Sequence, residues 1–152
     1  MITIKNNVRK VKTKVTVLKK DAQAVLSALK YPDYDLTILL TTNKTVHKYN
    51  RQFRNKDKPT DILSFPYYPE LKAGERIKPE DEDEKVLGDL IISPEYVQKD
   101  AISYNQTYDE RLQMLLVHGI LHLLGYDHIK DEEYEVMNKQ EKKLLKYLKT
   151  RD

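Results

Sequence analysis

The chain has 152 residues, enough to bury one sizeable hydrophobic core, and we expect a single domain spanning residues 1–152. Its composition, 39% hydrophobic and 34% charged, is typical of a globular protein, and the net charge of +3 permits a polyanionic partner without requiring one. The absence of cysteine excludes disulfides, thiolate metal ligands and cysteine nucleophiles.

The amino-terminal segment MITIKNNVRKVKTK contains no apolar run of the kind that a leader peptide or a membrane span needs. We therefore expect an intracellular, cytoplasmic protein that has no membrane partner. Residues 5–20 are strongly basic and predict either a solvated helix face or a contact with an RNA backbone. Apolar residues at helical spacing predict a helix over residues 14–30.

The middle of the chain contains three strand signals. LTILLTT at 36–42 predicts a buried strand, after which Asn43 is suited to cap a short helix that ends near Phe53. TDILSFPYY at 60–68 predicts a second strand, and VLGDLIIS at 86–93 predicts a third. We expect the last two to pair with each other across the long polar loop between them.

Helices dominate the rest of the chain. Ser93 followed by Pro94 predicts a helix start, because a capping side chain precedes a proline at the first helical position. Thr107 opens a capping-box sequence, and the helix that it starts should end at Gly125. A last helix is predicted over 131–149. Strands and helices that are partly segregated along the chain predict an α+β domain.

Three of the four histidines lie within the eleven-residue segment HGILHLLGYDH at 118–128. His118 and His122 are four residues apart in a predicted helix and therefore share one face of it. Gly125 ends the helix, so that His128 approaches the same point from the following turn. Three imidazoles with a fourth position left open are typical of a catalytic zinc site, although nickel, iron or copper would also suit these ligands. The alternative is three unrelated histidines, each satisfied locally near the core.

The spacing of these histidines also fits the zinc-peptidase pattern HExxHxxGxxH. Such peptidases need a glutamate directly after the first histidine as general base, and this chain has Gly119 there. Met137 lies where these peptidases have a methionine turn, but it falls in a predicted helix and is expected to pack in the core. A zinc-dependent peptidase is therefore a second interpretation.

A second segment, NRQFRNKDKPTDILSFP at 50–66, contains Arg54 at the end of the predicted short helix. An arginine fork is suited to binding a phosphate, and a dication on neutral ligands also favours an anionic substrate. The alternative role for Arg54 is that of an ordinary surface residue at a helix terminus.

HGILHLLGYDH, NRQFRNKDKPTDILSFP and LGDLIIS together resemble the YbeY family of bacterial metal-dependent endoribonucleases, collinearly from about residue 36 to residue 145. The resemblance implies a zincin-like α+β fold with a mixed four-stranded sheet, and one Zn²⁺ ion held by His118, His122 and His128. It also implies that Arg54 acts in catalysis, and we assign His118 a catalytic part alongside its role as ligand.

The resemblance further implies 3′-end maturation of 16S ribosomal RNA and late-stage ribosome quality control. Single-stranded RNA, the ribosomal RNA precursor and the small subunit are then the expected partners, and DNA is not. Attack on the phosphodiester by an activated water and attack by the ribose 2′-hydroxyl both remain open as mechanisms. A non-catalytic ribosome-assembly binding module is a further alternative to the enzyme.

No general base is obvious in the sequence. Asp127 is a candidate, either as the base or as a residue that holds a ligand histidine in place. Its alternative role is to stabilise the tight turn through its own side chain. Asp61 and Asp89, near predicted strand ends, are weaker candidates.

Overall fold

The computed structural model describes residues 1–151, whose four strands form a single mixed sheet. In chain order the strands are β1 (Ile2–Asn6), β2 (Asp35–Leu40), β3 (Ile62–Pro66) and β4 (Val86–Ile92). Their order in the sheet is β1-β2-β4-β3, with β1, β2 and β4 parallel and β3 antiparallel to β4 at one edge. The predicted α+β class, the mixed four-stranded sheet and the pairing of β3 with β4 are confirmed.

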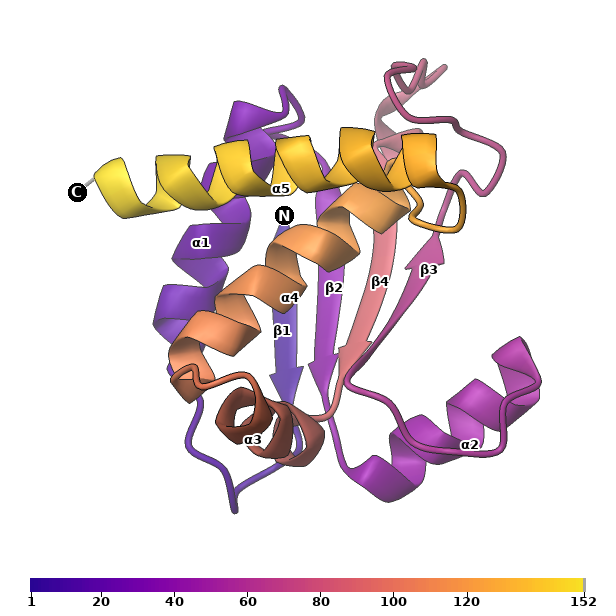
Figure 1. Cartoon of the computed structure of the whole chain (residues 1–152). Helices are drawn as coiled ribbons and strands as arrows, with labels where there is room; N and C mark the ends of the chain where they lie inside the picture. The colour runs from indigo at the N-terminus through magenta and orange to yellow at the C-terminus, as the bar shows by residue number, and fades with distance from the viewer. Residues whose placement is uncertain (152) are drawn as a thin grey trace.

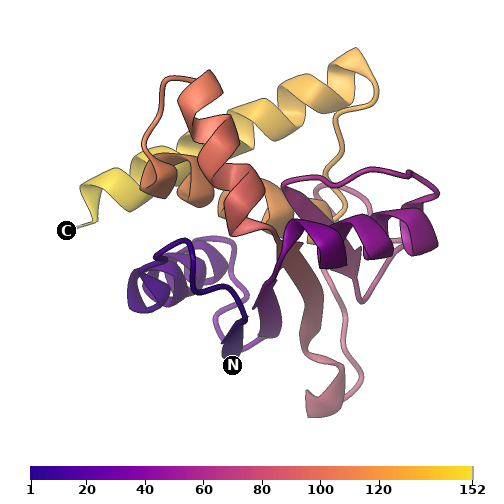
Figure 2. The same ribbon diagram turned by 90° about the horizontal axis from the view of Figure 1, so that it is seen from below.

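Five helices accompany the sheet: α1 (Val15–Ala28), α2 (Asn43–Arg54), α3 (Pro94–Ser103), α4 (Tyr108–Leu123) and α5 (Asp131–Thr150). Figure 1 shows α1 and α4 lying across one face of the sheet, with α5 crossing over α4. Seen from below in Figure 2, α2 lies apart from these helices, beside the strands. Edge strand β3 contacts both α4 and α2.

The core is built around α4, which contacts β3, β4, α1, α3 and α5. Half of its residues are buried, namely Leu112, Leu115, Leu116, Val117, Gly119, Ile120, Leu121 and Leu123. Their removal from water at roughly 25 cal/mol per Å² of apolar surface is the main force that fixes this helix against the sheet. Met137 of α5 is also buried in this core, as predicted for an ordinary packing residue.

The helix starts agree with the predicted caps except in α2. Ser93 caps α3, and Thr107 caps α4 with both hydrogen bonds of the capping box. In α2 the cap is Thr42, whose hydroxyl accepts a hydrogen bond from the backbone N–H of Thr45 at 3.3 Å, and the prediction of Asn43 was wrong by one residue. The Asn43 side chain instead accepts a hydrogen bond from the Ser93 hydroxyl, which ties α2 to the start of α3.

The end of α4 depends on Gly125, which has a φ of +92° as the sequence predicts for a helix-ending glycine. A Cβ atom at this position would collide with the backbone carbonyl of Leu71. Among the described residues, no helix combines the length and the apolarity needed to cross a bilayer.

We expect Gly125→Ala to lower the free energy of unfolding by about 1–3 kcal/mol, because alanine is strained at positive φ and its methyl group meets immobile backbone. Gly74→Ala is the matched control, since Gly74 has a φ of +88° but open space around its Cα. Urea unfolding of both variants separates the clash from the backbone strain. Equal destabilisation by the two substitutions would contradict the role given to the Leu71 contact.

Candidate metal centre and active site

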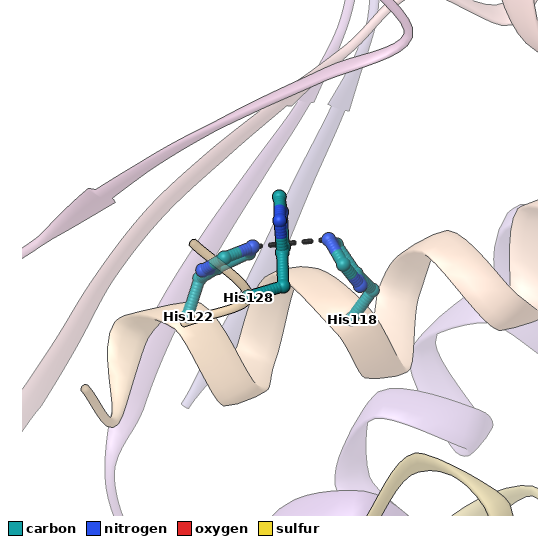
Figure 3. A group of neighbouring side chains, drawn as sticks. All are labelled: His118, His122 and His128. Atoms are coloured by element: carbon teal, nitrogen blue, oxygen red, sulfur yellow. Dashed lines mark hydrogen bonds between the residues drawn. The ribbon is translucent and has the colours of Figure 1, made fainter. Parts of the chain in front are cut away.

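The structure brings the three predicted ligand histidines together at the carboxyl end of α4 (Figure 3). His118 and His122 project from successive turns of the helix, and His128 reaches the same point from the segment before α5. Each ring offers one nitrogen to a set in which all members lie within 4.8 Å of one another. Nε2 of His118 and Nε2 of His122 are 3.0 Å apart.

The partners of the other ring nitrogens determine which nitrogens face the centre. Nδ1 of His122 lies 2.8 Å from the carbonyl oxygen of Tyr126, which accepts hydrogen bonds and cannot donate them. We therefore assign the proton of His122 to Nδ1. Its Nε2 then presents a lone pair to the centre of the cluster.

His118 is held in the same way by a carboxylate. Its Nδ1 lies 2.8 Å from Oε1 of Glu141, a residue of α5 whose side chain is only 16% exposed. A carboxylate in this position orients the ring and favours the proton on Nδ1. With both Nδ1 atoms protonated, two Nε2 lone pairs face each other at 3.0 Å. A cation between them, either a proton or a metal ion, would stabilise this arrangement.

The electrostatic environment favours the neutral, metal-binding form of His122. Burial, followed by the positive charges that His118 and His128 would carry, lowers the pKa of His122 to about 4. Near neutral pH this ring is therefore unprotonated at Nε2, which is the state that a metal ligand needs.

The donor set fits a tetrahedral zinc ion with one open position. Nitrogens about 2.0–2.1 Å from such an ion lie about 3.3 Å from each other, close to the separation of the two Nε2 atoms. His128 is exposed and offers its nitrogen from outside the helix, within 4.8 Å of the other two. The described residues therefore suit a mononuclear site held by three neutral imidazoles, as the sequence predicts.

Glu141 was missed by sequence reasoning. It lies 23 residues from His118 in the sequence, on a different helix, so no helical spacing indicates that it is near a ligand histidine. It is one of several acidic residues in the carboxyl-terminal helix, and only the packing of α5 on α4 distinguishes it from the others.

We expect Glu141→Gln to weaken metal binding about 10–100-fold, because glutamine can still accept a hydrogen bond from Nδ1 but no longer supplies the negative charge. Glu135→Gln is the matched control, since Glu135 lies on the same helix and is exposed. Competition with a chromogenic chelator measures the affinity of each variant for Zn²⁺. Equal affinities for the two variants would show that the Glu141 carboxylate does not tune the site.

A cleft of about 770 Å³ opens beside the histidines, between α4 and edge strand β3. Basic and polar side chains from both sides line it, including Arg54, Lys56, Lys58, Ser64 and Arg111 together with the three histidines. A groove of this kind suits a polyanion whose charge is neutralised by lysine and arginine. The cleft thus combines the candidate metal centre with a basic wall.

Arg54 occupies the wall of the cleft formed by the end of α2. Its Nη2 donates a hydrogen bond to the carbonyl oxygen of Ser64 at 2.6 Å, and its guanidinium carbon lies 4.7 Å from the centre of the Phe65 ring. These two contacts hold the arginine against strand β3 while its side chain stays exposed. Arg54 is therefore held at the cleft by contacts with two neighbouring residues of β3.

The three candidate bases occupy different places. Asp127 lines the cleft, but its Oδ1 accepts a hydrogen bond from the backbone N–H of His128 at 2.7 Å, which is the turn-stabilising role. Asp61 also lines the cleft and accepts a hydrogen bond from the N–H of Ile62. Asp89 is exposed on β4 and lies outside the cleft, so the structure does not support it as a base.

Comparison with known proteins places this site in a family. The family model described as endoribonuclease YbeY matches residues 3–149. The chain belongs to the YbeY endoribonuclease family. It is 40% identical to the endoribonuclease YbeY of Lysinibacillus sphaericus over 114 residues, which are 75% of this chain and 72% of that protein. With the Alkaliphilus metalliredigens YbeY it shares 33% identity over 151 residues, 95% of this chain and 92% of the relative.

The fold is shared with a solved structure as well. The solution structure of a Thermotoga maritima protein superposes with a TM-score of 0.61 at 27% sequence identity, covering 97% of this chain and 89% of the other. The resemblance to the YbeY family seen in the sequence motifs is therefore confirmed over nearly the whole chain.

Proposed function

We propose that this YbeY-family protein is a zinc-dependent endoribonuclease that cleaves single-stranded RNA and acts in 3′-end maturation of 16S ribosomal RNA and in ribosome quality control. The observation that carries the proposal is the single cleft in which the histidine cluster and Arg54 meet. The relatives' shared name, endoribonuclease YbeY, supports the same reaction class. The precursor of the small-subunit RNA and the small subunit itself are the proposed partners.

His118, His122 and His128 would hold the ion, with Glu141 and the Tyr126 carbonyl fixing the first two rings. When bound, Zn²⁺ supplies Lewis-acid polarisation of a phosphoryl oxygen or of an attacking water. Arg54 binds the phosphate and stabilises the charge that develops on it, because its fork is rigid and permanently charged. Asp61 and Asp127 are the carboxylates within the cleft that could accept a proton during the reaction.

The peptidase alternative is disfavoured by the position that follows the first histidine. A Cβ at Gly119 would lie 2.8 Å from Cδ1 of Ile62 and 2.9 Å from Cδ2 of Leu90, so this position packs tightly against the sheet. The glutamate that zinc peptidases place there would have to displace the side chains of Ile62 and Leu90. The same tight packing accounts for the glycine within α4.

The test uses purified protein loaded with Zn²⁺ and a ribosomal RNA precursor that carries the small-subunit 3′ end. We expect cleavage of single-stranded segments, its loss on chelation and its return when Zn²⁺ is added back. A duplex RNA and an unfolded protein substrate serve as controls. RNA left intact by a stably zinc-loaded protein would favour the non-catalytic binding module, and cleavage of the protein substrate would revive the peptidase.

A further inference from the structure

An aromatic cluster lies next to the cleft, and its only part in the function described so far is the contact of Phe65 with Arg54. The chain contains only two phenylalanines, and both belong to this cluster. Phe53 of α2 meets Phe65 of β3 edge to face, with ring centroids 5.6 Å apart, and Tyr49 lies 6.0 Å from Phe53. Phe53 is nevertheless 52% exposed, which is unusual for a phenylalanine.

Arg54 joins this cluster to the cleft. Phe65 lies on β3 between Ser64 and Pro66, both of which line the cleft, but it is not itself part of the lining. The Phe65 ring therefore lies beside the cleft and not within it. The guanidinium of Arg54 covers that ring, while its Nη2 reaches over to the Ser64 carbonyl.

We propose that Phe53, backed by Phe65, is a stacking subsite for a nucleobase of the RNA that enters the cleft. This inference rests on the proposed function and offers a reason why the same site would prefer single-stranded RNA. The Arg54 guanidinium and the Phe53 ring both contact the Phe65 ring. A nucleotide whose phosphate is bound by Arg54 would therefore lie close to the exposed ring of Phe53. Aromatic rings beside arginines are the usual platform for unpaired bases, and every base offers a π face.

The subsite gives a physical reason for single-strand selectivity. A base inside a duplex is stacked on both faces and paired along one edge, so it reaches the Phe53 ring only if the duplex opens. An unpaired base stacks at no such cost. Strand β3 is the edge of the sheet, and no further strand among residues 1–151 pairs with it there.

The alternative role of Phe53 is to pack α2 against β3. Phe53→Leu separates the two roles, because leucine keeps apolar contact with Phe65 but has no π face. Phe53→Trp restores a stacking surface. Tyr147→Leu is the matched control, since Tyr147 is 42% exposed on α5 and lies outside the cleft. The midpoint of urea unfolding is expected to be the same for Phe53→Leu and the wild type.

The experiment uses metal-free full-length protein and short single-stranded RNAs that carry 2-aminopurine at successive positions. We expect wild type and Phe53→Trp to quench the fluorescence at one position, and Phe53→Leu to bind about tenfold more weakly without quenching. Removing the base at that position should weaken binding to the wild type about tenfold and leave binding to Phe53→Leu unchanged.

Quenching that is equal in wild type and Phe53→Leu, or absent from the wild type at all positions, would overturn the stacking subsite. The subsite would also be overturned if binding of the abasic RNA to Phe53→Leu were weakened by the sum of the two separate losses of binding free energy. Cleavage of RNA by the zinc-loaded wild type would leave the proposed function intact in each of these cases. Conversely, failure of that cleavage with normal quenching would reject the nuclease and retain the subsite.

Discussion

His122→Ala is expected to abolish both stable zinc binding and RNA cleavage. The substitution removes one of three ligands and leaves two imidazoles that cannot enclose an ion. The loss of affinity should exceed the roughly 10–100-fold that removal of a supporting residue produces. His122 also has a pKa lowered to about 4, so near neutral pH no proton blocks its Nε2 from binding the metal.

His47→Ala is the matched control for this variant. His47 is the fourth histidine of the chain, lies on α2 and contacts Asp57 at 2.7 Å, outside the cleft. Metal analysis after dialysis, far-ultraviolet circular dichroism and cleavage of the ribosomal RNA precursor would be measured on both variants. A His122→Ala protein that folds normally and retains one equivalent of zinc would remove the proposed metal centre.

Arg54→Glu is expected to abolish cleavage while leaving the zinc content unchanged. The glutamate places a negative charge where the phosphate of the substrate must bind, and repulsion replaces a charge-assisted hydrogen bond. Loss of an electrostatic group that acts on the transition state commonly costs 10²–10³-fold in rate, and charge reversal should cost at least as much. The histidine cluster is untouched, because neither hydrogen bond of the Arg54 guanidinium involves a histidine.

Arg51→Glu provides the comparison, since it makes the same change of charge on the same helix at an exposed position outside the cleft. It should reduce affinity only modestly and in a salt-dependent way. Rates for both variants would be measured under single-turnover conditions over a range of salt concentrations. If Arg54→Glu and Arg51→Glu lowered the rate equally, Arg54 would contribute only general positive charge.

The elements of the fold that depend on local sequence were predicted well. The capping box at Thr107 marks the start of α4, and the positive φ of Gly125 marks its end. Both were predictable because hydrogen bonds and steric contacts within a few residues determine helix ends. The cap of α2 shifted from Asn43 to Thr42 because a contact with Ser93, 50 residues away, engages the asparagine. Thr42, which was not predicted as a cap, takes the capping role instead.

The sequence by itself determined that His118 and His122 share one helix face, because four residues make about one helical turn. Only the tertiary structure decided that Glu141 and the Tyr126 carbonyl fix their rings, that Arg54 joins their cleft, and that Asp89 stays outside it. These relations depend on how α5, β3 and α2 pack around α4. Burial of apolar area drives that packing, and this force is non-directional. The polar partners of the histidines are therefore determined only by the packed arrangement of the elements.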